Sequence, residues 1–426
     1  MRDVKTQAPI TTATETEDDT GAHGGTFVSL RLYPLIRWLW TGTIATNTAF
    51  WMYQVALGWL ALQLTDSAFW VGLAGFAGGI PILIFALPAG VVVDRFNRRT
   101  VLMAGQVGVM VSATLFSILI GTGLMNRWVM LVLACCYGSS MAFVFPTRHA
   151  IIGRLVEPRD LPNAIALNSA GQNATRVFGP SLAGLLIAVI GISGTFAFAA
   201  ALQIFALGSS LKLPSARPRS PGKRGPVLHS FTEGLRYVSA DPALYGTIIL
   251  ATVGTVLIMP YITMMPVFAQ YELDLGATGL GLLLTAVGIG SVLGALFIAG
   301  AQWITTRSGA QVVLLLAWVV TVLIFAFTPW VWIAMPILFL TGVLSAGFLA
   351  TNLSILQLRS DDEIRGRVLS VNQITWGLLP VGQLPLGLLA DHFGAPLATG
   401  GACMLAFLAI ALIVTRVPEL RRGEIT

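Results

Sequence analysis

Polar side chains that could contact a solute lie inside segments of this sequence that are otherwise apolar. One face of the segment over residues 163–190 carries them at helical spacing: Asn168, Gln172, Thr175, Arg176 and Gly179. Arg176 stands out because a charge within an apolar segment needs water, an anionic partner or a bound substrate. We therefore expect this face to line a binding cavity, and Arg176 favours an anionic solute. A contact between Arg176 and a backbone carbonyl is the competing structural interpretation.

Two further apolar segments carry residues of the same kind. The segment over residues 34–61 contains Asn47 and Gln54, and the segment over residues 366–390 contains a longer set: Asn372, Gln373, Trp376 and Gln383. Asn168 and Asn372 are 204 positions apart, which indicates a faint internal repeat. In membrane proteins with such repeats, the binding site lies between the repeats. We expect these residues to line one cavity, although a hydrogen bond between helices would explain any single Asn or Gln.

Other charged groups lie near the ends of the apolar segments. Arg148 is close to such an end, and we expect its side chain to reach the membrane surface by snorkelling. No Asp or Glu lies in the middle of an apolar segment. Coupling to a proton, which we expect, would therefore run through a carboxylate at a segment end, or differ from that of related proteins.

The sequence lacks the groups that an enzyme, a metal site or a cofactor site would need. Cys135, Cys136 and Cys403 lie in apolar segments, and the four histidines are scattered. We therefore expect neither a disulfide nor a metal site. Neither a phosphate-binding loop nor a GxGxxG pattern is present, and no nucleophile stands beside a base. We expect no cofactor and no enzymatic activity.

The composition is that of an integral membrane protein. Of 426 residues, 55% are hydrophobic and 10% are charged, against about 25% charged in soluble domains. About 20 apolar residues suffice for a helix to cross the membrane. Twelve such spans are predicted, at residues 34–61, 68–93, 100–121, 128–152, 163–190, 194–212, 242–270, 277–303, 310–328, 331–357, 366–390 and 396–415. The predicted fold class is all-α integral membrane, with about twelve helices in two six-helix halves.

The basic residues set the predicted orientation. If the N-terminus is inside the cell, the inner loops and tails carry nearly all of them, and the outer loops carry only Arg127. This is the positive-inside arrangement of multi-pass proteins, and it predicts a cell-membrane protein with both termini in the cytoplasm. It also explains the net charge of +6 without nucleic acid, which we exclude because no soluble basic face is predicted.

The predicted spans divide the chain into two halves and three cytosolic segments. Residues 1–30 are polar and are predicted to be a disordered tail, and residues 416–426 form a second tail. The halves cover residues 31–212 and 240–415, joined by a Pro-, Gly- and Lys/Arg-rich linker over residues 213–239. Apolar residues at helical spacing in the later part of the linker predict a short interfacial helix. The alternative is an extension of the next span.

A motif at the end of the second predicted span carries a recognisable pattern. Residues 90–99 read Gly-Val-Val-Val-Asp-Arg-Phe-Asn-Arg-Arg. This resembles the loop 2–3 motif of the major facilitator superfamily, G-x-x-x-D-R-x-G-R-R, with Asn97 at the usual glycine. The resemblance implies an inner-gate latch formed by Gly90, Asp94, Arg95, Arg98 and Arg99. We expect Asn97 to preserve the turn because asparagine tolerates left-handed backbone. An ordinary positive-inside loop is the alternative.

Two other stretches relate to this motif. The corresponding loop of the second half, residues 300–307, lacks the acid. Gly387-Leu-Leu-Ala-Asp391 has the same spacing, but it falls at a predicted outer loop, so we interpret it as a coincidence or a degenerate repeat.

The fifth predicted span contains a second family-like pattern. Thr175, Gly179, Pro180 and Gly184 resemble the tail of the superfamily's antiporter motif, G-x-x-x-G-P-x-x-G-G, although Thr175 and Ala183 replace two glycines. Among relatives this motif marks exporters, and packing of small residues is the alternative interpretation. Residues 145–180 are similar to the enterobactin-exporter-like and macrolide-efflux-like subgroup.

Together these features predict a secondary active exporter of a small amphipathic molecule such as a siderophore, an antibiotic or another metabolite. It would work by alternating access, coupled to protons, as a monomer in the lipid bilayer. An uptake symporter of the same fold is the main alternative, and a non-transporting membrane sensor is the remote one.

Overall fold

The computed structural model describes residues 27–157, 159–215, 227–300, 308–361 and 364–420, and within these ranges the regular elements are helices only. The first group of helices is α2 (Val28–Leu32), α3 (Pro34–Thr65), α4 (Ala68–Arg95), α5 (Arg98–Gly121), α6 (Arg127–Ile152) and α7 (Leu161–Leu211). The second group is α8 (Val227–Ala240), α9 (Pro242–Val253), α10 (Met265–Val267), α11 (Gly276–Gly300), α13 (Ser308–Ala326), α14 (Val331–Arg359), α15 (Arg365–Gly377), α16 (Leu379–Phe393) and α17 (Ala395–Arg416). Short π and 3-10 segments join α9 to α11: η1 (Gly254–Ile258), η2 (Met259–Ile262) and η3 (Phe268–Glu272). One further 3-10 turn, η4 (Pro418–Leu420), follows α17.

Nine helices in these ranges are long and apolar enough to cross a membrane. One of them, α7, has 51 residues, and Gly191 interrupts it with a positive φ of 73°. Such a helix would be about 75 Å long if straight, and α7 consists of two helical segments that meet at the Gly191 kink. These segments correspond in position to the separate spans predicted at 163–190 and 194–212.

Two predicted spans are absent from these nine for different reasons. α3 has sufficient length, with 32 residues, but it buries polar residues such as Thr43, Thr46 and Asn47 among its apolar ones. The span predicted at 366–390 is divided into α15 and α16 at Leu378, and Pro380 follows this break. Proline lacks the backbone N–H that a continuous helix needs, so a break at this point is expected.

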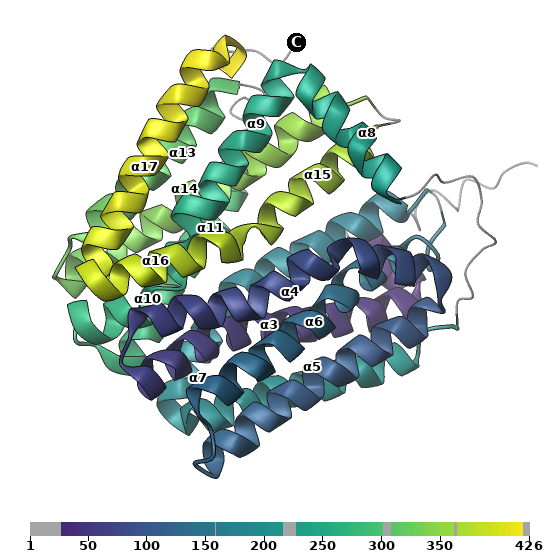
Figure 1. Cartoon of the computed structure of the whole chain (residues 1–426). Coiled ribbons are helices and arrows are strands. Elements are labelled where there is room, and N and C mark those ends of the chain that lie inside the picture. The colour runs from purple at the N-terminus through teal and green to yellow at the C-terminus, as the bar shows by residue number, and fades with distance from the viewer. Residues whose placement is uncertain (1–26, 158, 216–226, 301–307, 362–363, 421–426) are drawn as a thin grey trace, which may run out of the picture.

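Figure 1 shows that α3–α7 form one group of helices and α9–α17 another. The main packing between the groups pairs α4 with α16 and α7 with α11. We call the end where α4, α6 and α14 finish the basic end, because it carries Arg95, Arg98, Arg159, Arg359 and Arg367. The other end is the opposite end. The two groups diverge toward the basic end, which faces the upper right, and converge at the opposite end.

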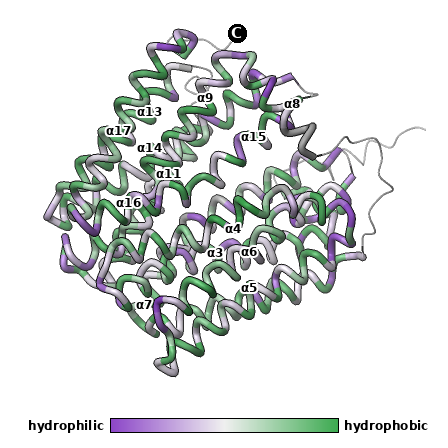
Figure 2. The backbone as a smooth tube through the Cα atoms, in the orientation of Figure 1, coloured by the Kyte–Doolittle hydropathy of each residue, from purple (hydrophilic) through white to green (hydrophobic). Residues whose placement is uncertain are grey.

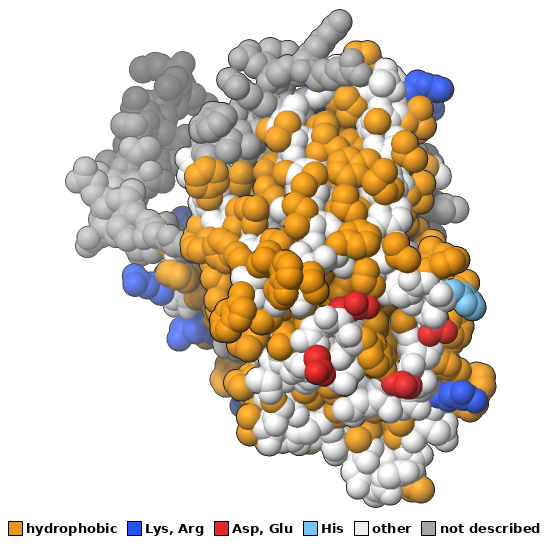
Figure 3. Space-filling model, turned by 90° about the vertical axis from the view of Figure 1, so that its left-hand side faces the viewer, with side chains coloured by type: hydrophobic (Ala, Val, Ile, Leu, Met, Phe, Trp, Pro, Cys, Tyr) orange, Lys and Arg blue, Asp and Glu red, His pale blue; other side chains and the backbone are white. Residues whose placement is uncertain are grey.

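The outer surface of the bundle is hydrophobic along the length of the helices. Figure 2 shows apolar stretches through the helices, with hydrophilic residues mainly near their ends. Figure 3 shows one face that is largely hydrophobic, with acidic side chains gathered in its lower part. Large apolar side chains such as Val189 and Leu408 are about two-thirds exposed. A surface of this kind fits a hydrocarbon environment, which requires no hydrogen bonds from the side chains it touches.

The segments predicted to flank the two halves are only partly described. Residues 1–26 and 216–226 lie outside the described part of the chain. Residues 28–30, placed in the tail by prediction, belong to α2. The later part of the predicted linker forms a separate helix, α8, and Asp241 separates it from α9, so it is not an extension of the next span.

Candidate functional site

Arg176 lies between the two groups of helices. Its guanidinium carbon is 4.4 Å from the ring centroid of Trp376 on α15 and 5.6 Å from that of Trp51 on α3. Its Nη2 atom is 3.7 Å from the sulfur of Met259 in η2. Since α7 and α3 come from the first group and α15 and η2 from the second, this cluster bridges the groups. The structure therefore brings two of the predicted cavity residues, Arg176 and Trp376, together.

Aromatic faces surround the Arg176 charge, and acids do not. Within the described ranges, the ion pairs of the chain do not include Arg176. A cation over a tryptophan ring gains about 0.5–2 kcal/mol, depending on how far it is removed from water. That attraction leaves the positive charge without a neutralising partner. An anionic group on a solute would complete the cluster.

Small residues on α7 allow the close helix contacts that place the Arg176 side chain in this cluster. A Cβ atom added at Gly179 would come within 2.6 Å of the Trp51 Cβ and 3.3 Å of the Thr48 carbonyl oxygen. Glycine at 179 therefore lets α7 approach α3 closely and places Trp51 beside Arg176, one turn away. On α7's other side, Gly184 meets the backbone of Gly281 on α11. The antiporter-like motif thus packs α7 against both groups of helices.

The remaining motif residues and several predicted cavity residues are buried within the helical packing. Thr175 is buried and donates to the Gln172 carbonyl (2.7 Å), and Pro180 is also buried. Asn47 donates to the Thr43 carbonyl of its own helix (3.0 Å). Asn168 is 4% exposed. These contacts place Asn47 and Thr175 in hydrogen bonds within their helices.

The predicted residues of the second half divide into two environments. Gln383 is buried and donates to the Thr263 hydroxyl (2.8 Å), and its amide also packs against Gly75 of α4. Gln383 therefore lies in the α4–α16 contact and links it to the segment after η2. Asn372 and Trp376 are half-buried and Gln373 is exposed. The buried Asn372 Oδ1 atom has no hydrogen-bond partner among the described residues. Gln54 on α3 is half-buried.

The predicted inner-gate motif lies at the basic end and is partly exposed. The Asp94 side chain is 62% exposed, and its contact in the motif is Arg98 at 3.8 Å. Arg98 donates to the Ala150 carbonyl (2.7 Å) and Arg99 to the Leu211 carbonyl (2.9 Å). Both arginines therefore fasten the start of α5 to the ends of α6 and α7. Arg95 is exposed, and Gly90 is half-buried.

The expected role of Asn97 is wrong. Its φ is −61°, which is ordinary backbone, and its side chain accepts a hydrogen bond from the Arg99 N–H (3.0 Å). Asn97 is therefore the N-cap of α5, a position that asparagine favours because its side-chain oxygen satisfies a free helix N–H. Residues 301–307 lie outside the described part of the chain. The prediction that this loop lacks the latch therefore stays a prediction.

The prediction that Arg148 snorkels to the surface is also wrong. Its side chain is 2% exposed and donates to Thr46 (2.7 Å), Thr43 (3.0 Å) and the Leu39 carbonyl (3.3 Å), all on α3. These oxygens accept hydrogen bonds from the two terminal nitrogens of the guanidinium inside the first group of helices, whereas the buried Nε atom has no hydrogen-bond partner among the described residues. The threonines at positions 43 and 46 share a helix face, which is the sequence signal that could have indicated this contact.

A groove between α7 and α11 is lined by none of the residues of the Arg176 cluster. It has a volume of about 420 Å³ and is lined by α7 and α11, with Phe178, Leu185 and Leu282 among its apolar residues. None of the predicted site residues lines it. In the described ranges, no group of three His, Cys, Asp or Glu residues could hold a metal ion.

Comparisons with known proteins agree with this architecture. Residues 25–425 match the model of a family of the major facilitator superfamily described as transmembrane secretion effector. The multidrug efflux pump Tap of Mycolicibacterium fortuitum is 29% identical over 384 residues, which cover 87% of this chain and 92% of that protein. The staphyloferrin A transporter of Staphylococcus aureus is 23% identical over 357 residues, which cover 81% and 86%.

A solved structure shows the same fold. It is that of a bacterial homologue of the human lysosomal transporter Spinster, in an inward-facing and unoccupied conformation. The TM-score is 0.71 at 13% identity, and the match covers 92% of this chain and 99% of that one.

Proposed function

The chain belongs to the transmembrane secretion effector family of the major facilitator superfamily, and from this premise we propose that it exports a small amphipathic molecule by secondary active transport. The superfamily predicted from the motifs is confirmed, and the protein is a multi-pass protein of the cytoplasmic membrane. Its family and relatives are transporters and not enzymes. The match over residues 25–425 is the observation that carries the proposal.

The proposed architecture has twelve spans in two halves of six. To the nine apolar helices it adds α3, the second pass of α7 and the pair α15–α16. An even number places both termini on one side, and the positive-inside rule makes the basic end cytosolic. The halves are residues 31–212 and 240–415, joined by the linker at 213–239.

The proposed mechanism is alternating access, in which the halves rock about a central site. Two observations support it. Close contacts between the halves concentrate at the opposite end, where glycines of α4 and α7 meet α16 and α11. At the basic end the halves diverge (Figure 1) and Asp94 of the gate motif is exposed. This arrangement supports the proposal that the carrier is open to the cytosol here, with the inner latch released.

The proposed substrate is amphipathic and carries an anionic group. Arg176 offers an unneutralised cation, and Trp51 and Trp376 offer aromatic surface for an apolar body. Because these residues come from both halves, a solute bound among them would contact both moving parts. Relatives are named for multidrug efflux and for staphyloferrin A, so siderophores, antibiotics and other metabolites are the candidate substrates.

The proposed driving force is a proton gradient, and the proposed working unit is a monomer. The carboxylates of the described spans lie at or near span ends, as Asp94 and Asp391 do. A proton carrier in this chain would therefore be near a membrane surface. Uptake by symport on the same fold is the second candidate function, and a non-transporting sensor is a remote third.

Transport into inside-out vesicles that contain this protein alone tests the proposal. A pH gradient would be imposed, and siderophores, macrolides and dyes would be offered. We expect gradient-dependent accumulation of at least one compound. Accumulation only in right-side-out vesicles would establish uptake, and a folded protein that moves no compound in either direction would contradict transport.

The role of Arg176 is tested by Arg176→Ala. Loss of a hydrogen bond to a charged group costs about 1.5–3 kcal/mol, so we expect at least tenfold weaker transport of anionic compounds and a smaller loss for neutral ones. Arg127→Ala is the matched control, because Arg127 also lies over two tryptophan rings, at 5.1 and 5.6 Å, but at the opposite end. Equal losses for anionic and neutral compounds would instead assign Arg176 a structural role.

The latch role of Asp94 has its own test. We expect Asp94→Asn to reduce flux strongly while the protein remains in the membrane, because the charge that should hold the inner gate closed is lost. Glu157→Gln, another exposed acid at the basic end, is the control and should transport normally. Undiminished flux in Asp94→Asn would exclude the latch.

A further inference from the structure

Asp391, near the end of α16, contacts the beginning of α4 in the other half of the molecule. Its Oδ1 atom accepts hydrogen bonds from the Ser67 hydroxyl (2.7 Å) and the Phe69 N–H (3.3 Å). Ser67 is the N-cap residue of α4. The first N–H groups of a helix lack partners within the helix and carry partial positive charge, so a carboxylate there is favourable. The carboxylate of one half therefore caps a long helix of the other.

The backbone beside this contact has no room for a side chain. Gly387 precedes Asp391 by one helical turn, so both residues lie on the same face of α16. A Cβ added at Gly387 would lie 2.8 Å from the Gly72 Cα and 2.9 Å from the Ala68 carbonyl oxygen, both on α4. The pair of glycines lets the two helices touch, and this approach brings Asp391 within reach of Ser67.

These residues repeat the pattern of the inner-gate motif at the other end of the molecule. Gly387-Leu-Leu-Ala-Asp391 and Gly90-Val-Val-Val-Asp94 both place an aspartate one turn after a glycine near the end of a helix. The sequence alone suggested that the second copy was a coincidence or a degenerate repeat. The contacts differ, however: Asp391 engages the partner half, whereas Asp94 is 62% exposed at the end where the halves diverge.

We propose that Gly387 and Asp391 form the outer latch of the transport cycle, which holds α16 against α4 while the cytosolic side is open. This inference rests on the proposed alternating access. In the outward-open state the Asp391 contacts break and the Asp94 motif closes instead. In this proposal α4 takes part in a latch at each end: its own Asp94 supplies the carboxylate at the basic end, and Asp391 of α16 supplies it at the opposite end.

A second contact strengthens the outer latch at the same turn. The Tyr271 hydroxyl in η3 donates a hydrogen bond to the Asp66 carboxylate. Asp66 ends α3 in left-handed backbone, with φ 54°. The α3–α4 turn, residues 66 and 67, is therefore held from two elements of the second half.

Electron spin resonance distances between the two halves test the latch without any substrate. Labels would be attached at Leu124→Cys and Trp332→Cys, positions of the first and second half that are 67% and 86% exposed at the opposite end. The full-length protein would be reconstituted in lipid nanodiscs, with alanine at each of the native cysteines: Cys135, Cys136 and Cys403.

We expect Asp391→Ala to lower the ratio of the short-distance to the long-distance population about tenfold, the size expected for lost hydrogen bonds to a charged group. Gly387→Ala should shift the ratio in the same direction, because its Cβ forces the helices apart. Glu272→Ala is the matched control, an exposed acid at the same end, and should leave the ratio unchanged. The latch is overturned if Asp391→Ala behaves as Glu272→Ala does.

The same samples separate the latch from the export proposal. A shifted distance ratio in Asp391→Ala supports the latch even where the parent protein moves no compound, in which case only the export proposal fails. A parent that exports, together with an unshifted ratio in Asp391→Ala, removes the latch alone.

Discussion

The basic ends of the two halves are built on one plan but are held by different chemistry. In the first half, Tyr33 precedes Pro34 of α3 and donates its hydroxyl to Asp160 before α7 (2.8 Å). In the second half, Tyr237 lies on α8 just before α9 and donates to Asp361 before α15 (3.0 Å). The two tyrosines are 204 positions apart, the same offset that separates Asn168 and Asn372.

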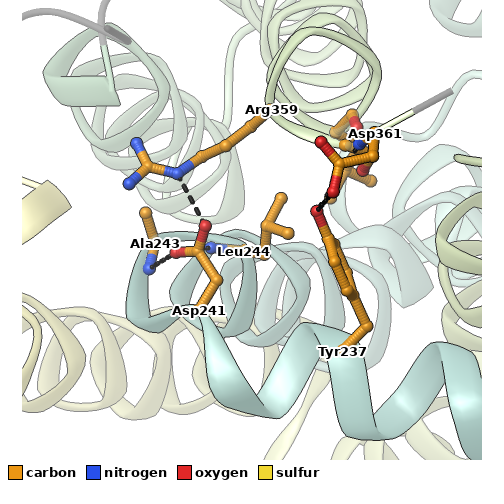
Figure 4. A network of polar contacts seen from close by, with 8 residues as sticks. Tyr237, Asp241, Ala243, Leu244, Arg359 and Asp361 are labelled. Carbon is orange, nitrogen blue, oxygen red and sulfur yellow. Dashed lines mark hydrogen bonds and ion pairs between the residues drawn. The ribbon is translucent and has the colours of Figure 1, made fainter. Parts of the chain in front are cut away.

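The surroundings of these contacts differ. In the first half the second link is neutral: the Ser29 hydroxyl donates to the Asn163 side chain (2.8 Å). In the second half it is ionic, as Figure 4 shows: Arg359 donates to Asp241 (2.8 Å), and Asp241 also caps α9 through the N–H of Ala243 (2.8 Å) and Leu244 (3.3 Å). A further ion pair joins Glu233 of α8 to Arg367 of α15.

The two halves thus share the tyrosine–aspartate contact and differ in the second link beside it. The shared tyrosine–aspartate contact ties the residue just before α3 to the loop before α7, and ties α8 to the loop before α15. The second half ties α8 down with charges, and α8 follows the linker between the halves. In the second half, ionic contacts therefore hold α8, which follows the linker. In the first half, neutral hydrogen bonds hold α2 in the corresponding place.

Among the variants that test this difference between the halves, we expect Asp241→Ala to have the largest effect on stability. It removes both the cap of α9 and the ion pair to Arg359, and Asp241 is only 27% exposed. We expect the free energy of unfolding to fall by about 1–3 kcal/mol, seen as a lower midpoint of thermal unfolding in detergent. Glu157→Ala, an exposed acid in the first half, is the control. An equal midpoint for the two variants would show that the ionic link does not stabilise the second half.

The pH dependence of that effect has a defined sign. Partial burial alone would raise the pKa of Asp241, but the hydrogen bonds from Arg359, Ala243 and Leu244 outweigh it and lower the pKa below its ordinary 3.8. The contribution of Asp241 is therefore complete above that ordinary value and is lost as the pH falls through the lowered one. The midpoint difference between the parent and Asp241→Ala should be constant near neutral pH and shrink only below about pH 4.

Removal of each tyrosine hydroxyl tests the contact that the two halves share, and we expect an intermediate effect on stability. The hydrogen bond to Asp160 raises the pKa of Tyr33, so the phenol stays protonated and donates throughout the neutral range. Asp160 is 7% exposed whereas Asp361 is exposed, and a buried acceptor that loses a donor cannot turn to water. Tyr33→Phe should therefore lower the unfolding midpoint by a few degrees, and Tyr237→Phe by less. The reverse order would mean that burial of the aspartate does not decide the strength of this contact.

The sequence predicted the membrane helices more completely than it predicted the contacts between them. The length and apolarity of the spans predict the helices, because a hydrocarbon environment leaves few alternatives. The break of α7 at Gly191 and the separate α8 also follow the predicted limits. The burial of Arg148 against α3 was not predicted, because the partners of a buried cation can be neutral oxygens far away in the chain.

The residues of the candidate site were likewise predicted only in part. Arg176 and Trp376 were predicted as cavity residues from polarity and spacing, and they lie together. Trp51 and Met259, which complete the cluster, are apolar residues in apolar segments, so no polar signal marks them. Gln383 was predicted to line the same cavity as Arg176, and it lies in the α4–α16 contact, where Gly75 leaves room for its amide. Polarity identifies candidate helices, whereas glycine positions decide which side chains meet.

We expect Glu233→Gln to have the smallest effect on stability. It removes one ion pair of the second half and therefore tests the ionic contribution alone. The Glu233 and Arg367 side chains are 40% and 38% exposed, and exposed ion pairs contribute about 0–1 kcal/mol. Salt screens such a pair, so the unfolding midpoints of the parent and Glu233→Gln should converge as the salt concentration rises. Ser29→Ala, which removes the neutral link of the first half, should keep a constant difference from the parent across the same salt series. Two differences that respond alike to salt would show that the halves are held by the same kind of interaction after all.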